Sequence, residues 1–348
     1  MNREPMPHRL ERLRAKLWIR RRLVAHGFTE AGLRGMVHRG ELLRILQGRY
    51  VFATDWEALN GEDRHLLRAL AVDAGAVGSP VFSHFTSALL HGLPLLRFDL
   101  TRVHISSSRA PDTPAQGQQK APSPSDGSRA RVIRHHRLAD TNDLARTGGL
   151  VHTSLIRAVV EVTRTAPFAA GVVCADAALR RLVRMDDLAT ETARTRLLAH
   201  LDTLPGAPGT ARARRVLRFA SALAESPLES LSRLQLARLG FEILEQVAVP
   251  ARRGRPYRLD FELIGRRCFV EADGKVKYTD EDMLNGRTAN EKVFEEKRRG
   301  DWISGVTGKS VLHIGWPDAQ APRALGSTLR SFGVPSPSPD GLARPELY

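Results

Sequence analysis

Residues 257–274, YRLDFELIGRRCFVEADG, carry the pattern that decides the expected fold of the C-terminal third of the chain. Apolar and polar residues alternate from Tyr257 to Ile264 and again from Arg267 to Asp273, which is the period of two that strands show. Gly265-Arg266 between these runs is suited to a two-residue turn. We therefore expect an antiparallel hairpin in which Ile264 faces Arg267.

This register brings acidic side chains together. Asp260 faces Glu271, and the alternation puts Glu262 and Asp273 on the same face. Directly opposed Cβ atoms lie about 4.5–5.5 Å apart, a spacing at which like charges destabilise a sheet. One explanation is a polar face covered by water, and the other is a hard cation such as Mg²⁺, held by one or two carboxylates plus a phosphate. We favour the cation, because clustered acids among the apolar neighbours of both strands are costly without compensation.

A helix is expected directly before the hairpin, in SPLESLSRLQLARLG at residues 226–240. Ser226 is a suitable N-cap, Pro227 fits the first helical position and Gly240 ends the helix. Glu229 completes a capping box with Ser226, which explains this glutamate without any catalysis. The same helix can also present Glu229 toward a metal, and the two roles are compatible.

The N-terminal region predicts two helices followed by a basic hairpin. The first helix covers Leu17 to His26, and Thr29 caps a second helix that runs to His38. In ELLRILQGRYVF, the runs Leu42–Leu46 and Arg49–Phe52 flank a Gln-Gly pair suited to a tight turn. Helix, turn, helix and hairpin is the layout of a winged helix.

Several polar and basic residues of this layout occupy the positions at which a winged helix meets DNA. The second helix of such a domain enters the major groove, and the hairpin touches the phosphate backbone. Residues 1–50 contain twelve Arg and Lys against four Asp and Glu, the charge balance of a nucleic-acid-binding region. The alternative, that these arginines form only a solvated face, stays open. The residues expected near DNA are Thr29, Arg34, His38, Arg39, Arg44 and Arg49.

The composition of the whole chain limits the remaining classes. Among 348 residues, 53 Lys and Arg against 38 Asp and Glu leave a net charge of +15, which attracts polyanions. Two cysteines, Cys174 and Cys268, exclude a disulfide scaffold and a Cys-rich zinc module. No apolar run is long enough to cross a bilayer, and residues 1–26 lack the apolar core of a secretory signal. We expect a cytoplasmic protein with no membrane partner.

Three stretches together resemble the very-short-patch-repair-like branch of the PD-(D/E)XK nuclease superfamily, over roughly residues 210–318. They are SPLESLSRLQLARLGF, YRLDFELIGRRCFVEADGKVKY and EKVFEEKRRGDWISGVTGKSVLHIGW. The N-terminal LRGMVHRGELLRILQGRYVF resembles the winged-helix segment of AbiEi-type antitoxins from type IV toxin–antitoxin systems. The first resemblance implies metal-dependent DNA hydrolysis, and the second implies DNA binding and a cognate toxin.

The nuclease resemblance assigns roles to individual residues. The helix acid of the superfamily matches Glu229, the strand Asp matches Asp260 and the second acid matches Glu271, which together would bind Mg²⁺ or Mn²⁺. Where the superfamily usually has a lysine near the attacking water this chain has Asp273, and either Lys275 or Lys277, just beyond the strand, is a substitute. All three therefore remain candidates for the catalytic group. The basic residues expected to hold the DNA backbone are Lys277, Lys297 and Arg298.

These observations predict an α+β protein that acts as a metal-dependent DNA endonuclease. The competing hypothesis is a non-catalytic DNA-binding regulator of the AbiEi-antitoxin type, in which the nuclease fold is degenerate. The expected segments are a winged-helix domain at 1–97, a strand with a flexible Ser/Pro-rich insertion at 98–137, a helical middle at 138–225, a restriction-endonuclease-like domain with a central mixed sheet at 226–333, and a disordered tail at 334–348.

Overall fold

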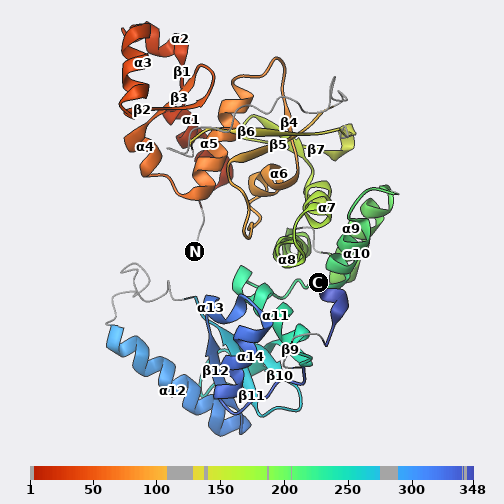
Figure 1. The fold of residues 1–348 in the computed structure, drawn as a ribbon. Helices are drawn as coiled ribbons and strands as arrows, with labels where there is room; N and C mark the ends of the chain where they lie inside the picture. Colours follow the sequence, from red (N-terminus) through yellow and green to blue (C-terminus); the bar gives the residue numbers. More distant parts are fainter. Residues whose placement is uncertain are drawn as a thin grey trace. The chain divides into compact units, whose positions relative to one another are not determined.

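The computed structural model describes residues 4–107, 128–136, 140–185, 188–204, 206–274, 289–338, 340 and 343–348. The chain divides into two compact units, Met1–Thr165 and Ala166–Tyr348, and helices and three sheets are distributed between them (Figure 1). The expected α+β class is confirmed. Within the described ranges, no helix is both long and apolar enough to pass through a membrane.

The first unit begins with the expected helix and hairpin pattern, with one change. The expected helix at 17–26 begins only at Arg20, because Trp18 and Ile19 pair with the hairpin as a third strand. Thr29 caps the next helix by accepting a 3.1 Å hydrogen bond from the Gly32 N–H, and the expected hairpin is present. The elements are α1 (Met6–Lys16), β1 (Trp18–Ile19), α2 (Arg20–Ala25), α3 (Glu30–His38), β2 (Leu42–Leu46) and β3 (Arg49–Phe52), with sheet order β1-β3-β2.

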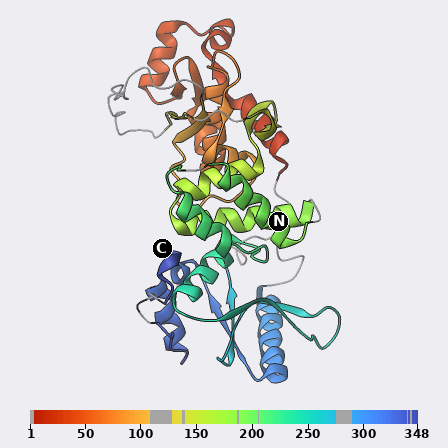
Figure 2. The ribbon, with the colours of Figure 1, turned by 90° about the vertical axis from the view of Figure 1, so that its right-hand side faces the viewer.

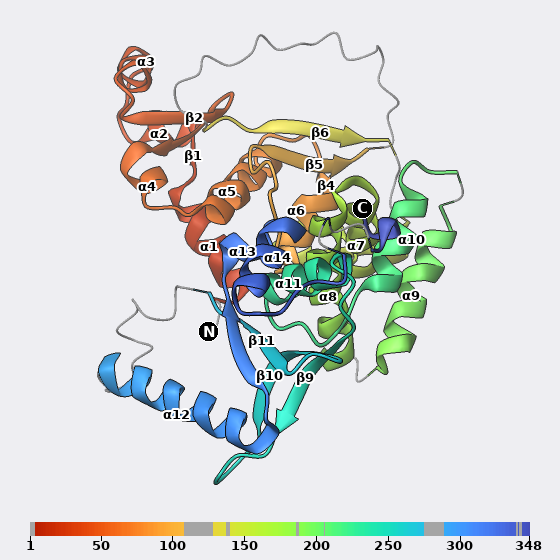
Figure 3. The same ribbon diagram turned by 60° about the horizontal axis from the view of Figure 1, so that its bottom comes forward.

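A five-stranded sheet completes this unit, in the order β6-β5-β4-β8-β7. Figure 3 shows β5 and β6 side by side, and they pair in parallel. The helical region expected at 138–225 does not begin with a helix, because residues 144–153 contain the antiparallel strands β7 and β8. The remaining elements are α4 (Ala53–Glu57), α5 (Gly61–Asp73), β4 (Val81–Phe82), α6 (His84–Leu90), β5 (Arg102–Ser106), β6 (Arg131–His135), β7 (Leu144–Thr147), β8 (Leu150–Thr153) and α7 (Leu155–Thr165).

One hydrophobic core joins α1 and the hairpin to the five-stranded sheet, which explains why the first unit extends beyond the expected boundary at 97. Leu10 of α1, Ile45 of the hairpin, Leu66 of α5 and Val103 of β5 are fully buried in the same cluster. The helix α1 thus buries its apolar face in a core shared with later strands, whereas Leu23 of α2 and Leu33 of α3 pack with Leu42 in a smaller cluster. Most of the expected flexible insertion, residues 108–127, lies outside the described part of the chain.

The second unit contains a four-stranded mixed sheet in the order β12-β11-β10-β9. Only β11 and β12 are parallel, and the helix α12 packs along β12 (Figure 2). The helices α8, α9 and α10, expected as a separate middle region, belong to this unit. Arg233 of α11 forms a buried ion pair with Asp176 of α8, at 2.9 Å. The elements are α8 (Phe168–Met185), α9 (Thr190–Asp202), α10 (Thr210–Phe219), α11 (Pro227–Arg238), β9 (Ile243–Val249), β10 (Tyr257–Leu263), β11 (Cys268–Ala272), α12 (Ala289–Thr307), β12 (Ser310–Ile314), α13 (Trp316–Ala319) and α14 (Pro322–Ser331).

The segment after Val334 is ordered where the structure describes it, contrary to the expected disordered tail. Leu347 is only 2% exposed, and its carbonyl accepts hydrogen bonds of 2.6 and 3.2 Å from Arg238 on α11. The Arg238 guanidinium also lies 4.0 Å from the centre of the Tyr348 ring. The Pro- and Ser-rich composition suggested disorder, but the buried Leu347 side chain, Arg238, Arg215 and backbone hydrogen bonds from Ser338 and Ala343 anchor the segment.

Replacing this apolar anchor should weaken the second unit. We expect Leu347→Ala to lower the free energy of unfolding by about 2–5 kcal/mol, because it removes a fully packed side chain. Urea denaturation monitored by tryptophan fluorescence would measure the change. Leu223→Ala is the control, since Leu223 is 48% exposed, and equal effects of the two substitutions would contradict the packing of Leu347.

Candidate active site

Strands β10 and β11 pair in the expected register, and this pairing stops next to Asp260. The pairs Phe261–Val270 and Leu263–Cys268 continue the alignment in which Asp260 is opposite Glu271. Instead of a further backbone bond, the Ala272 N–H donates to the Asp260 carboxylate at 2.8 Å. The side chain therefore takes the place of the next rung of the ladder.

The neighbouring strand β9 is also irregular at this level. Its pairing with β10 continues on both sides of Gln246, which has a backbone φ of +52°. Leu259 packs in one cluster with Phe269, although regular alternation from the Phe261–Val270 pair would put them on opposite faces. The alternation of β10 therefore shifts at Asp260, and this position is a break in the sheet.

The irregular strands bring Asp260 next to Glu229 and Gln246. The Gln246 amide nitrogen lies 3.3 Å from Glu229 and 3.4 Å from Asp260, between the two carboxylates. Glu229 is 7% exposed and accepts a 2.7 Å hydrogen bond from the Glu225 N–H, while Ser226 caps the helix as expected. Burial raises the pKa of Glu229 to about 7, and the nearby charge of Asp260 acts in the same direction.

A second acidic group surrounds Glu271. Arg299 of α12 donates two hydrogen bonds to its carboxylate, at 2.6 and 2.8 Å. His313 of β12 is paired with Glu271 across the parallel strands, and its Nδ1 donates to Asp273 at 2.6 Å. That hydrogen bond raises the pKa of His313, because the carboxylate stabilises the imidazolium form. Asp273 lies one residue beyond the end of β11.

The expectation that Asp260, Glu262, Glu271 and Asp273 share one face is wrong for Asp260, whereas Glu262 is opposite Phe269 and so shares a face with Glu271. Asp260 joins Glu229 through Gln246, whereas Glu271 and Asp273 face Arg299 and His313. Glu262 forms an ion pair with Lys309, next to the Phe269 ring. The shift of alternation at Asp260 separates this residue from the other three acids, and each acid has a specific polar or cationic neighbour.

The three predicted metal ligands do not all meet. Within the described ranges no three His, Cys, Asp or Glu side chains converge on a position for a metal ion, so Glu229, Asp260 and Glu271 do not form one ligand set. Glu229 and Asp260 nevertheless flank a common point, and Gln246, turned about its terminal bond, would add an amide oxygen. Mg²⁺ accepts one or two carboxylates and keeps several waters, so this all-oxygen set fits it.

The basic residues expected near this site differ in where the structure places them. Lys275 and Lys277 lie outside the described residues. Lys297 and Arg298 are exposed on α12, and Arg298 stacks near Phe294 at 5.9 Å. The residue that contacts a site carboxylate is Arg299. It lies four residues after Glu295, a spacing typical of ordinary surface ion pairs on a helix.

Of the residues expected near DNA in the first unit, some are exposed and others form hydrogen bonds within the protein. Arg34, His38 and Arg44 are exposed, while Arg39 is bound to Glu41 at 2.7 and 3.0 Å. Arg49 donates to the carbonyls of Gln47 and Ala74, at 2.9 and 2.5 Å, which ties the hairpin to the end of α5. Thr29 is used as a helix cap.

Three contributors to the site were not predicted as functional residues: Gln246, Arg299 and His313. Gln246 carries no turn signal in the sequence, since positive φ is usually met by Gly or Asn. His313 is the polar residue within the apolar run VLHI, and this position in the sequence could have marked it as a candidate functional residue. Comparison with protein-family models, curated proteins and solved structures found no match to this chain.

The raised pKa of Glu229 makes a sign-definite prediction. Between about pH 4.5 and 7 the folded protein binds the Glu229 proton more tightly than the unfolded chain does. Ionisation of Glu229 therefore lowers the free energy of unfolding of the protein as pH rises through that window. Glu229→Gln keeps the acceptor for Glu225 but cannot ionise. The variant should therefore gain stability relative to wild type from about pH 5 to 7.5, by about 1.4 kcal/mol for each pH unit between the unfolded and folded pKa values. Urea melts at several pH values would measure it, and a constant difference would contradict the buried ionisation.

Proposed function

We propose that this protein is a DNA-binding, Mg²⁺- or Mn²⁺-dependent endonuclease that hydrolyses phosphodiester bonds in DNA. The observation that carries the proposal is the convergence of Glu229, Gln246 and Asp260 from three different elements. Both carboxylates contact the same amide, and the charge of Asp260 helps to raise the pKa of Glu229, so a cation held between them would lower their mutual repulsion. A divalent cation is the group that fits this oxygen-lined position.

Each residue of the site has a definite part in this proposal. Glu229 and Asp260 would hold the cation, which when bound polarises a phosphate and lowers the pKa of its water. Glu271 lies on the adjacent strand, with His313 Nδ1 at 3.9 Å. Asp273 fixes the orientation of that imidazole, so the His313–Asp273 pair takes the place of the missing strand lysine in orienting water. Lys275 stays a sequence-based candidate for the same task.

The competing function is a non-catalytic DNA-binding regulator, acting with a cognate toxin. A specific observation favours it: Arg299 already neutralises Glu271, as in a site that needs no metal. Under this hypothesis Asp260 and Glu229 are structural residues that close the gap in the sheet. The exposed Arg34, His38 and Arg44 of the first unit supply DNA binding under either hypothesis.

The nuclease proposal predicts cleavage that depends on the acids and on the metal. The purified protein should cut DNA with Mg²⁺ or Mn²⁺ and not with EDTA. The double variant Asp260→Asn, Glu271→Gln should lose activity by at least about 10²-fold while staying folded, because both charges are lost while the side-chain size and one acceptor oxygen at each position are kept. Gel assays on duplex, mismatched and single-stranded DNA, with circular dichroism, would measure this.

Glu262→Gln is the matched control, since Glu262 lies on the same strand and binds Lys309 instead. This variant should keep wild-type cleavage. Cleavage by the double variant at the wild-type rate would disprove the site. A wild-type protein that binds every substrate and cuts none would favour the regulator.

DNA binding by the first unit should depend on individual arginines in different ways. Arg44 is exposed, so Arg44→Ala should lower the slope of log affinity against log salt by about one phosphate contact. Arg49 is bound to two carbonyls, so Arg49→Ala should cost about 1 kcal/mol of stability and leave the slope nearly unchanged. Fluorescence anisotropy at several salt concentrations and thermal melts would separate them. An affinity independent of salt would refute DNA binding through this surface.

A further inference from the structure

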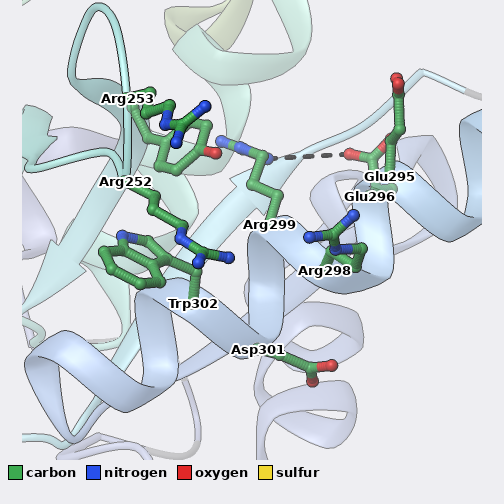
Figure 4. A pocket seen from close by; sticks show the side chains of 9 residues that line it. Arg252, Arg253, Glu295, Glu296, Arg298, Arg299, Asp301 and Trp302 are labelled. Atoms are coloured by element: carbon green, nitrogen blue, oxygen red, sulfur yellow. Dashed lines mark ion pairs between the residues drawn. The ribbon is translucent and has the colours of Figure 1, made fainter.

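A groove runs beside the candidate site, between α12 and the loop that joins β9 to β10. Its volume is about 1050 Å³, and Figure 4 shows the side chains that line it. Arg252 and Arg253 come from the loop, and Arg298 and Arg299 come from the helix. We call this feature the arginine groove; its wall also includes the aromatic rings of Tyr257 and Trp302.

The groove offers cationic groups to a ligand. Arg252 and Arg253 are exposed, and within the described residues neither has an ion-pair partner. The helix also contributes three acids, Glu295, Glu296 and Asp301; Glu296 is 3.7 Å from Arg299, and Asp301 points away from the arginines in Figure 4. The four arginines of the lining outnumber its three acids, so the groove has a net positive charge that favours an anion.

Arg299 connects the groove with the candidate site. It lines the groove, lies 5.5 Å from the centre of the Tyr257 ring, and at the same time makes both hydrogen bonds to Glu271. A guanidinium engaged on a carboxylate in two bonds cannot bind a phosphate in the same bidentate geometry. A ligand phosphate and Glu271 therefore compete for the same group.

We propose that the arginine groove binds the phosphodiester backbone of DNA, and that Arg299 exchanges its Glu271 carboxylate for a backbone phosphate when DNA binds. This inference rests on the proposed nuclease function. Release of Glu271 adds a carboxylate to the side of the site next to Asp260 and so favours a divalent cation. DNA binding and cation binding then strengthen each other, because coupling between two ligands is reciprocal.

The chemistry of the groove selects a nucleic acid over an acidic peptide. The planar fork of arginine matches two phosphate oxygens at once. Tyr257 and Trp302 add flat apolar faces, on which bases stack and carboxylate side chains gain nothing. The Trp302 indole N–H donates to the Pro250 carbonyl at 2.9 Å, which fixes the ring against the loop that carries Arg252.

The test is a titration of the full chain with Ca²⁺, a hard cation that prefers oxygen ligands. Calorimetry is done without DNA and with saturating 12-nucleotide DNA, single-stranded in one arm and duplex in another, and with a poly-glutamate peptide in a third. In wild type we expect DNA to tighten Ca²⁺ binding by at least about fivefold, the lower end of ordinary coupling between sites. In Arg299→Gln, Ca²⁺ should bind equally with and without DNA, and as tightly as to DNA-bound wild type.

Arg298→Ala is the matched control, because Arg298 lines the groove on the same helix and its described ring contact is with Phe294. It should weaken DNA binding and keep the coupling. Ca²⁺ binding to wild type that DNA leaves unchanged, or coupling that survives in Arg299→Gln, overturns the inference and leaves the nuclease proposal intact. Absence of Ca²⁺ binding in every arm overturns both, and equal coupling by poly-glutamate overturns the choice of DNA.

Discussion

The second unit depends on how a sheet accommodates buried carboxylates. An ionised acid within a packed interior is tolerated only with a hydrogen-bonded or cationic partner. Asp176 meets Arg233, Glu271 meets Arg299 and Glu262 meets Lys309. Glu229 and Asp260 differ, since a neutral amide lies between them. These two acids share one amide at the place where the strands lose their regular pairing.

Local sequence signals predicted the elements that local physics determines. Ser226 and Pro227 fixed the start of α11, Thr29 fixed the start of α3, and the hairpin pattern gave the correct register of β10 and β11. The face to which Asp260 points could not be predicted in this way. It depends on the positive φ of Gln246 in another strand, which no residue-type preference announces.

Tertiary packing decided the rest. The first unit extends to Thr165 and not only to residue 97, because one hydrophobic cluster contains both Leu10 and Val103, which are far apart in the sequence. His84, His104 and His135 come from three different elements, yet their rings stack, and burial lowers the pKa of His104 to about 3. Arg299 and His313 become neighbours of Glu271 only once β12 pairs with β11 and α12 packs beside it. Such partners are set by the fold and not by spacing along the chain.

The backbone at Gln246 narrows the paths open to this protein as it evolves. Glycine would relax the positive φ but would remove the amide that separates two carboxylates. Asparagine tolerates that conformation, yet its side chain is one methylene shorter and would fall short of one partner. β-Branched residues fit neither requirement. Few single substitutions are therefore neutral at this position. A lineage that loses the glutamine would need a second change at Glu229 or Asp260 to reduce the repulsion between the two carboxylates.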